Sequence, residues 1–384
     1  MDDHTRISCG DTAQSSDEHS SAESTMNHQK RKIAVIPGDG IGIDVTREAV
    51  RVFDLLNDRC ALGLELVHFD YGADKYLATG ISLPKEQLED FRDNYAALFL
   101  GALGDPRIPD MAHARDILFG MRFGLDLYVN LRPVKLFDEK LCPLKGKTVD
   151  DVDFVVFREN TEGLYVGTGG FFKKGTKDEV ALQESVNTYK GVERIIRFAF
   201  DYAKAHGNTK VTMSDKNNAL RYEGDLWQRV FQQVGEEYPD IEKEHWFIDA
   251  LTMQMIKKPE QFQVIVTNNM FGDIITDVGA QLQGGLGMAA SGNINPNGVC
   301  MFEPVHGSAP KYAGKNVANP FGAILTVGLM LEHLGFVNEG ALIEQAARQA
   351  VREDKTTSDI GGNLGTKEAG TAVCEIIDHL LVKD

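Results

Sequence analysis

The chain is poor in cysteine, in basic charge and in long apolar runs, and each shortage excludes a class of protein. Its five cysteines are odd in number, lie far apart and lack metal-ligand spacing, which excludes a disulfide scaffold and a cysteine-based zinc or redox motif. The excess of acids, 57 Asp and Glu against 40 Lys and Arg, argues against a nucleic-acid partner, because phosphate binding requires a basic face. No segment carries the roughly 20 apolar residues of a membrane span. We therefore expect a cytoplasmic protein with reduced thiols that binds neither membrane nor nucleic acid.

We also expect no signal peptide, because residues 1–30 are polar and have no apolar core. We expect this segment to be a disordered tail. A chain of 384 residues with ordinary apolar content is long enough for two domains or one large, subdivided α/β domain. Short apolar runs alternate with helical patterns, which predicts a largely parallel sheet covered by helices. Strands are expected at residues 33–36, 64–69, 96–100, 154–157, 210–213, 245–248 and 264–266, and helices at 44–57, 321–333, 339–353 and 366–381.

Two glycine-rich segments interrupt this alternation. Gly167–Thr176 mixes glycines with aromatic residues and predicts a protruding arm or loop rather than a helix. Gly284–Pro296 has the composition of a loop.

Two nucleotide-binding motifs are absent. The loop GDGIG at residues 38–42 follows a strand, but a Rossmann fingerprint would need its third glycine at Ile43. No Gly-Lys-Ser/Thr follows the loop either, which excludes a P-loop. The loop is best interpreted as a tight turn between a strand and a helix.

Acidic residues suggest a metal site in the segment NNMFGDIITD, which follows a predicted strand. Asp273 and Asp277 are four residues apart, so on a helix they share one face and could supply two oxygen ligands to one divalent cation. Their position after the carboxyl end of a strand favours a ligand site, because open α/β sheets bind ligands there. The alternative is a solvated acidic face of a helix.

Basic residues in apolar surroundings suggest a site for an anionic substrate. Arg122, Arg132 and Arg158 lie in stretches apolar enough to be partly buried, and buried guanidinium groups need anionic partners. They either pair with internal carboxylates or hold a substrate that carries several carboxylates. Lys216 follows the strand at 210–213 and is either a solvent-facing lysine or a base. Asp249 follows the strand at 245–248 and is a candidate third metal ligand.

Together these stretches resemble the isocitrate and isopropylmalate dehydrogenase family of metal-dependent, β-decarboxylating dehydrogenases, over about residues 31–382. The resemblance lies in separate motifs in the right order: GDGIG, the stretch from Arg122 to Arg132, RENTEGLY, the DK-x-N of residues 215–218, FGDIITD and HGSAPKYAGKNVANP. It implies an α/β fold of two domains, distinct from Rossmann, with a large mixed, mostly parallel sheet. The first, dinucleotide-side domain would comprise residues 31–127 and 285–384. The second, residues 128–284, would carry an arm that clasps a second copy in a homodimer.

The resemblance also implies roles for individual residues. Arg122, Arg132 and Arg158 would hold the substrate carboxylates. Mg²⁺ or Mn²⁺ would be bound by Asp273 and Asp277 together with Asp249 of the other subunit. Tyr165 and Lys216 would act as acid and base, with Lys216 also reaching across the interface. The dinucleotide, NAD or NADP, would be bound by His306, Gly307, Ser308, Ala309, Pro310, Lys311, Tyr312, Asn319, Asn218 and Asp359.

Substrate choice in this family depends on the helix before the first arginine, here ARDILFGMR at residues 114–122. Leu118 and Phe119 share a face with Arg122, where isocitrate enzymes have polar residues that meet a third carboxylate. An apolar wall disfavours that carboxylate and suits the isopropyl group of 3-isopropylmalate, whose product, 2-oxo-4-methylpentanoate, belongs to leucine biosynthesis. Isocitrate, homoisocitrate, tartrate and D-malate remain alternatives, because RENTEGLY is closer to other branches and Arg115 replaces a common acid.

The cofactor signals are mixed. Lys311 resembles NADP-using members, in which a cation beside the 2′-phosphate is favourable, whereas Ala318 and the segment SDIGG resemble NAD-using members. We expect both dinucleotides to be used. A catalytically silent regulatory subunit on the same fold is a remote alternative, because Tyr165, Lys216 and the three aspartates are all present.

Overall fold

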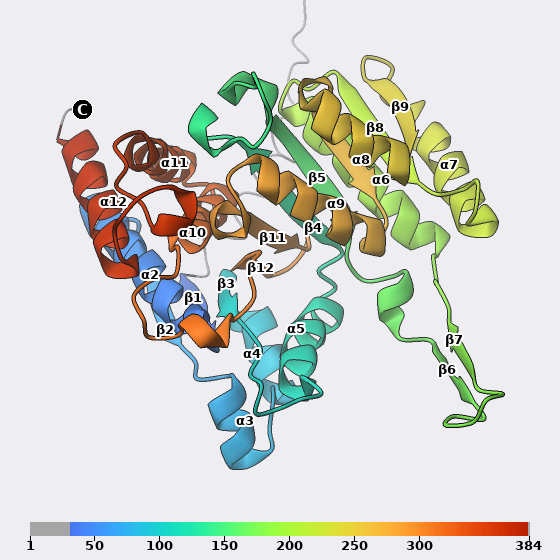
Figure 1. The fold of residues 1–384 in the computed structure, drawn as a ribbon, viewed down its shortest axis with the longest axis horizontal. Coiled ribbons are helices and arrows are strands. Elements are labelled where there is room, and N and C mark those ends of the chain that lie inside the picture. The colour runs from blue at the N-terminus through green and yellow to red at the C-terminus, as the bar shows by residue number, and fades with distance from the viewer. Residues whose placement is uncertain (1–30, 383–384) are drawn as a thin grey trace, which may run out of the picture.

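The computed structural model describes residues 31–382, so the expected tail at residues 1–30 lies outside the described residues. Ten strands form one sheet in the order β2-β1-β3-β12-β11-β4-β5-β10-β8-β9, and β6 pairs with β7 in a separate hairpin (Figure 1). The strands are β1 (Lys32–Gly38), β2 (Glu65–His68), β3 (Ala97–Ala102), β4 (Val129–Lys135), β5 (Asp153–Glu159), β6 (Gly169–Phe172), β7 (Val180–Gln183), β8 (Lys210–Asp215), β9 (Glu242–Phe247), β10 (Val264–Thr267), β11 (Ala290–Ile294) and β12 (Cys300–Pro304).

Helices cover both faces of this sheet (Figure 1). They are α2 (Ile41–Arg59), α3 (Ala73–Thr79), α4 (Lys85–Asn94), α5 (Ala112–Gly124), α6 (Tyr189–Ala205), α7 (Arg221–Gly235), α8 (Ile248–Lys257), α9 (Asn269–Leu282), α10 (Phe321–His333), α11 (Val337–Arg352) and α12 (Thr366–Leu381). Within the large sheet, β11 and β4 run antiparallel to their neighbours, and the other neighbouring strands are parallel. The expectation of a mixed, mostly parallel sheet is confirmed.

The sheet has two halves that meet where β11 pairs with β4. One half contains β1, β2, β3, β11 and β12, and its helices α2, α10, α11 and α12 pack together. The other half contains β4, β5, β8, β9 and β10, with α6 packed on one face and α9 on the other. Every strand of this second half falls within residues 128–284, as expected of the second domain. That the halves are separate domains stays a prediction.

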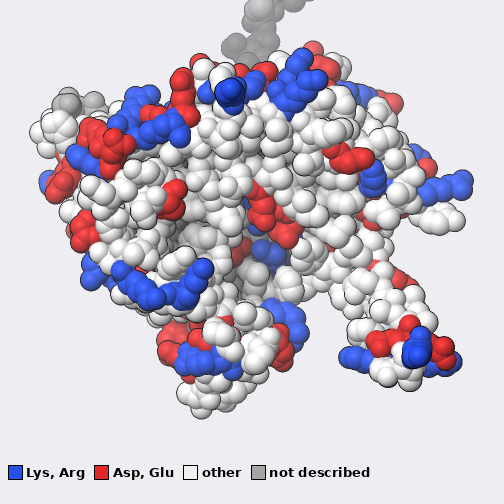
Figure 2. All heavy atoms as spheres, in the orientation of Figure 1, with Lys and Arg blue, Asp and Glu red and all other residues white. Residues whose placement is uncertain are grey.

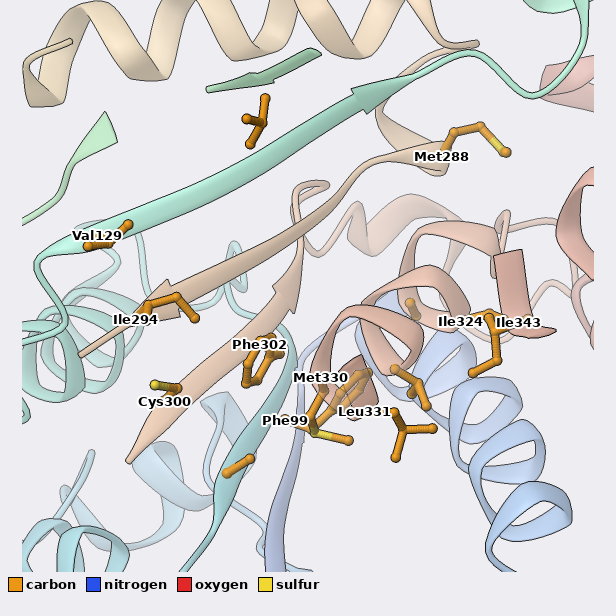
Figure 3. Close-up of a cluster of buried hydrophobic side chains, with 14 of the residues drawn as sticks. Phe99, Val129, Met288, Ile294, Cys300, Phe302, Ile324, Met330, Leu331 and Ile343 are labelled. Atoms are coloured by element: carbon orange, nitrogen blue, oxygen red, sulfur yellow. The ribbon is translucent and has the colours of Figure 1, made fainter. Parts of the chain in front are cut away.

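Apolar side chains of α10 form much of the core beside the first half of the sheet. Figure 3 shows Ile324, Met330 and Leu331 of this helix facing Phe302 of β12 and Phe99 of β3, and all five are buried. Burial of large apolar side chains like these contributes roughly 1.5–3 kcal/mol each, before entropy is subtracted. The packing fixes α10 against the central strands β11 and β12 of the sheet.

Two expectations about local structure are wrong. Gly284–Pro296 was expected to be a loop, yet it contains β11, a strand buried along its whole length. Its small and polar residues, Ser291 and Asn293, bond to neighbouring strands, so their polarity is satisfied inside the sheet rather than by solvent. The strand expected to end at Ile248 ends at Phe247, and Asp249 lies in the first turn of α8.

The arm expected around Gly167–Thr176 does protrude from the molecule. Strands β6 and β7 form an antiparallel hairpin that extends away from the body of the molecule (Figure 1). Its large apolar side chains are exposed, Phe171, Phe172 and Leu182 by 61%, 64% and 63%. Such an unburied apolar patch is typical of a surface that contacts another chain.

Candidate active site

The GDGIG segment forms a tight turn that joins β1 to α2. Gly38 and Gly40 adopt positive φ angles of 72° and 59°, and a Cβ atom on Gly40 would lie 2.1 Å from the carbonyl oxygen of Ser308. The same carbonyl accepts the first backbone N–H of α2, from Ile41, at 2.7 Å. Only glycine allows this close approach, which fixes the segment beginning at His306 against the start of α2.

Three buried arginines from three elements converge near the carboxyl end of β5, which pairs with the amino-terminal half of the antiparallel strand β4. Arg122 of α5 donates to Glu303 at 3.1 Å, and Arg132 of β4 donates to Thr276 at 2.9 Å. Arg158 of β5 donates to Asp273 of α9 at 2.6 Å. These side chains lie 5%, 7% and 1% exposed, so the guanidinium groups are held in place rather than solvated. The Nε of Arg122 is buried and has no hydrogen-bond partner in the described part of the chain.

Burial and neighbouring positive charges lower the pKa values of arginines in this cluster. Burial, and after it the charges of Arg132 and Arg122, lowers the pKa of Arg158 to about 9. Burial likewise lowers the pKa of Arg132. The three guanidinium groups lie close enough to act on one another, and Glu303 and Asp273 supply one carboxylate partner each to Arg122 and Arg158. Such a cluster favours an additional anion.

Asp273 and Asp277 lie one turn apart on α9, as the sequence predicts. Burial by itself would raise the pKa of Asp273, but Arg158 and a hydrogen bond from Tyr165 hold that pKa below its usual value. Burial raises the pKa of Asp277. Gly272 directly precedes Asp273. A Cβ atom on Gly272 would lie 2.5 Å from Cγ of Arg158, so the position of the Arg158 side chain requires glycine here. The pair therefore faces the arginines and not bulk solvent alone.

Tyr165 belongs to the same cluster. Its hydroxyl donates to the Oδ2 atom of Asp273 at 2.8 Å, and the guanidinium of Arg158 lies 5.2 Å from its ring centroid. Burial, followed by the bond to Asp273, raises the pKa of this phenol, so it is protonated at neutral pH. Figure 2 shows acidic and basic side chains in the hollow at the centre of this face, between the positions of α9 and α5 in Figure 1.

Lys216 and Asp249 form a second, separate group. The ammonium of Lys216, which follows β8, lies 2.7 Å from Asp249 Oδ2 and 5.9 Å from the ring centroid of Phe247. The bond from Lys216 is the largest effect that lowers the pKa of the exposed Asp249. Across residues 31–382, no three or more His, Cys, Asp or Glu side chains are grouped as a metal site. Asp249 thus does not join Asp273 and Asp277 within one chain.

Several polar residues of the cluster were not anticipated from the sequence. Asn269 accepts two bonds from Arg158, and Glu303 accepts from both Arg122 and Asn293. Thr276, between the two aspartates, accepts from Arg132. Asn269 and Thr276 stand inside the same motif as the aspartates, which was a usable signal. Glu303 lies on β12, in a stretch where no strand was expected.

The α5 face gives the cluster an apolar side. The ring of Phe119 makes an edge contact with Tyr165, with centroids 6.3 Å apart, and Arg122 lies 5.9 Å from the Phe119 centroid. Leu118 is half-buried against the apolar core beside β3. Asp116 accepts a bond from Ser82 and lies beside Arg115, both of them half-exposed.

The expected dinucleotide residues lie on both sides of the Gly40 turn. The Nε2 of His306 is buried and has no partner among the residues that the structure describes. Burial lowers the pKa of this imidazole, so the ring is neutral at neutral pH. Asn319 donates to Asp359 at 3.0 Å, which joins two of the expected residues. Lys311 and Tyr312 are exposed, with the ammonium 4.7 Å from the ring centroid. Asn218 is exposed beside Lys216, and Gly307, Ser308, Ala309 and Pro310 form the connecting loop.

Comparisons with known proteins agree with this geometry. The family model for isocitrate/isopropylmalate dehydrogenase matches residues 32–373. The chain is 46% identical to a 3-isopropylmalate dehydrogenase of Thermobifida fusca over 352 residues, 90% of this chain and 99% of the relative. It is 47% identical to a 3-isopropylmalate dehydrogenase of Nocardia farcinica over 349 residues, 90% of this chain and 100% of the relative.

A solved structure also resembles this one. Isocitrate dehydrogenase from Methylococcus capsulatus superposes with a TM-score of 0.81 and 36% sequence identity, covering 90% of this chain and 99% of that protein. No helix among residues 31–382 is long and apolar enough to cross a membrane. Fold, motifs and relatives agree along most of the chain, which therefore belongs to the isocitrate/isopropylmalate dehydrogenase family.

Proposed function

We propose that this chain oxidises and decarboxylates 3-isopropylmalate to 2-oxo-4-methylpentanoate, using NAD or NADP and a divalent cation. The observation that carries the proposal is the convergence of Arg122, Arg132 and Arg158 with Asp273 and Tyr165. Among the described residues Arg122 and Arg158 have one ion pair each and Arg132 has none, so the two carboxylates of a malate derivative would supply further negative charge. The relatives named as 3-isopropylmalate dehydrogenases support the same substrate.

Leu118 and Phe119 support a substrate with an apolar substituent. Both are half-buried and lie on the α5 face that carries Arg122. A third substrate carboxylate beside them would lose hydration without gaining a partner, which costs several kcal/mol at typical values. An isopropyl group would instead bury apolar surface there.

The acidic pair fits a hard divalent cation. Asp273 and Asp277 offer carboxylate oxygens from adjacent turns of α9, and the lowered pKa of Asp273 keeps that group ionised. Oxygen ligands suit Mg²⁺ or Mn²⁺. A cation held by these carboxylates would polarise the substrate hydroxyl, and a bound dinucleotide would supply the hydride acceptor for the hydroxyl-bearing carbon. Asp249 of a second copy would complete the ligand set.

Tyr165 and Lys216 fit complementary proton transfers. The phenol of Tyr165 is protonated at neutral pH and lies among the substrate-binding groups, so it can deliver a proton to the carbon that loses CO₂. Lys216 would take the hydroxyl proton, for which it must be a neutral amine. In the free chain the Nζ atom of Lys216 lies 2.7 Å from Asp249 Oδ2.

The separation of these groups supports a homodimer with shared active sites. Lys216 and Asp249 contact each other rather than Asp273, and the β6–β7 hairpin exposes Phe171, Phe172 and Leu182. A two-fold axis would bring each Lys216 and Asp249 pair to the other chain's arginine cluster.

One observation supports the use of NADP, and another supports the use of NAD. Lys311 is an exposed cation next to the expected adenosine site, which suits a 2′-phosphate. Asn319 is held by Asp359, within the SDIGG segment that resembles NAD-using members. A preference above about a thousandfold for either dinucleotide, roughly 4 kcal/mol, would refute dual use.

One assay tests the proposal. The purified chain is incubated with 3-isopropylmalate, isocitrate, homoisocitrate, D-malate or tartrate, with each dinucleotide and with or without Mg²⁺, and NAD(P)H absorbance is followed. We expect the highest kcat/KM with 3-isopropylmalate, and only with the cation. No absorbance change with any substrate would support a non-catalytic subunit instead.

A further inference from the structure

A large cavity lies on the opposite face of the sheet from the arginine cluster. Along β4, Arg132 faces the cluster while its neighbours Leu131 and Pro133 line the cavity. On β5, Arg158 faces the cluster and Val155 lines the cavity. Successive side chains of a strand point to opposite faces, so the sheet itself separates the two sites.

The cavity has a volume of about 890 Å³, within the range of small-molecule sites. Its floor is formed by β4, β5 and β11, and its walls come from the two halves of the molecule. Phe198 and Tyr202 of α6 form one wall, and Leu325 and Leu329 of α10 form the other. Figure 3 shows the labelled side chains of Met288 and Ile294, which also line it, beside the core around α10. An apolar body of about aromatic size fits between these walls.

A buried amide donor is left without a partner in this cavity. Gln283, which follows α9, is 2% exposed, and its Oε1 accepts the backbone N–H of Lys135 at 2.8 Å. Gln283 lines the cavity, and its Nε2 has no hydrogen-bond partner among residues 31–382. A buried donor without an acceptor typically costs about 1–3 kcal/mol, which an acceptor on a ligand would recover.

The charges of the lining favour a cation. The lining acids are Asp150, Asp153, Glu260, Glu332 and Glu344, against Lys135. Glu344 is paired with Lys135 at 2.7 Å and with Arg348 at 3.3 Å, and Glu260 is paired with Lys147 at 2.6 Å. The other three acids make no ion pair within the described part of the chain.

The charges of two of these unpaired carboxylates raise the pKa of one tyrosine. Burial, followed by the charges of Glu332 and Asp153, raises the pKa of Tyr202 to about 12. The Tyr202 ring stacks on the His206 ring at a centroid distance of 3.8 Å, and this contact fixes the orientation of the Tyr202 ring. Burial also raises the pKa of Asp153, so this carboxylate would gain from a cationic partner. A carboxylate pair beside a fixed aromatic ring is suited to an ammonium group.

We propose that this cavity is a second ligand site that binds a small organic ammonium compound with an apolar, aromatic-sized body. The ammonium lies between Asp153 and Glu332, beside the Tyr202 ring. The body fills the space between α6 and α10, and a hydrogen-bond acceptor on the ligand meets the amide of Gln283. The proposal does not depend on which substrate the arginine cluster takes, because the two sites lie on opposite faces of the sheet.

The test uses 2-phenylethylamine as the probe, titrated into the full chain by isothermal calorimetry. A ligand of this size should bind with a Kd on the order of 1 mM. Two comparison ligands separate the contributions: 3-phenylpropionate carries the opposite charge, and ethanolamine carries the ammonium without the apolar body. Both should bind at least about tenfold more weakly, a difference of about 1.4 kcal/mol.

Substitutions of residues that line the cavity test whether the amine binds there. Glu332→Gln removes an exposed carboxylate, and Leu329→Trp fills the space between the walls; each should weaken the amine at least about fivefold. The matched control Glu86→Gln removes an exposed carboxylate on α4 and should change nothing. Circular dichroism verifies folding, and turnover with malate derivatives should stay at the parent rate in Glu332→Gln. The proposal is overturned by equal binding of the phenylpropionate, by binding that both cavity variants leave unchanged, or by no binding of the amine at about 10 mM.

Discussion

Two inactive variants should restore activity to each other when their subunits are exchanged. Lys216→Ala removes the proposed base, and Asp277→Asn removes one proposed metal ligand. In the structure these residues belong to separate groups, since Lys216 contacts Asp249 while Asp277 shares a face of α9 with Asp273. If each active site takes one group from each chain, a mixed dimer contains one site with neither substitution and one with both.

The size of the recovery follows from this geometry. Each variant by itself should lose about 10²-fold to 10⁴-fold in kcat, as is typical when a general base or a cation ligand is removed. Random exchange makes about half of the dimers mixed, and each mixed dimer has one intact site of two, so activity returns to about a quarter of the parent value. Were the groups to meet within one chain, every site of every dimer would carry a substitution.

The assay mixes equal amounts of the two purified variants, dissociates them mildly in urea, dilutes them to allow reassociation, and follows NAD(P)H formation. Each variant treated in the same way is the control for refolding losses, and the parent chain gives the reference rate. Size-exclusion chromatography with light scattering establishes that dimers have re-formed. Recovery no greater than the sum of the two controls, in a sample that contains mixed dimers, would refute the shared site.

Three further predictions concern specificity, acidity and the cation. Leu118→Ser should shift the ratio of kcat/KM for isocitrate over 3-isopropylmalate upward by about tenfold or more, because a pocket contact of this kind is typically worth 1–3 kcal/mol; an unchanged ratio would contradict the role of the α5 face. Burial raises the pKa of Glu159 to about 7, so folded protein holds this proton more tightly than unfolded protein, and stability should be full below about pH 4 and fall as pH rises through 7. Glu159→Gln should remove that fall, on the order of 1–3 kcal/mol, as measured by thermal unfolding from pH 5 to 8; parallel curves for the two proteins would contradict it. Exhaustive chelation should reduce turnover at least about 100-fold without changing the circular dichroism, and added Mg²⁺ or Mn²⁺ should restore it; a full rate without metal would contradict the proposal.

Elements whose signal lies in local periodicity were predicted well. The segments of β1, β5, β8 and β10 were expected from short apolar runs, and α10 and α12 from helical patterns, within a few residues of their bounds. Strands β1, β5 and β10 are buried on both faces, so apolar residues follow one another along most of their length. Strand β11 was missed because its small and polar residues bond to β4 and β12, partners far away in sequence.

The sequence by itself determined the family, the mixed α/β class and the spacing of Asp273 and Asp277 on one helical face, because each depends on residue order over short distances. Only the tertiary structure decided which groups meet. It brings Arg122, Arg132 and Arg158 together from three elements, supplies Glu303 and Asn269 as their partners, and leaves Lys216 with Asp249 in a separate group. Such contacts depend on strand order and helix packing, which local residue patterns do not encode.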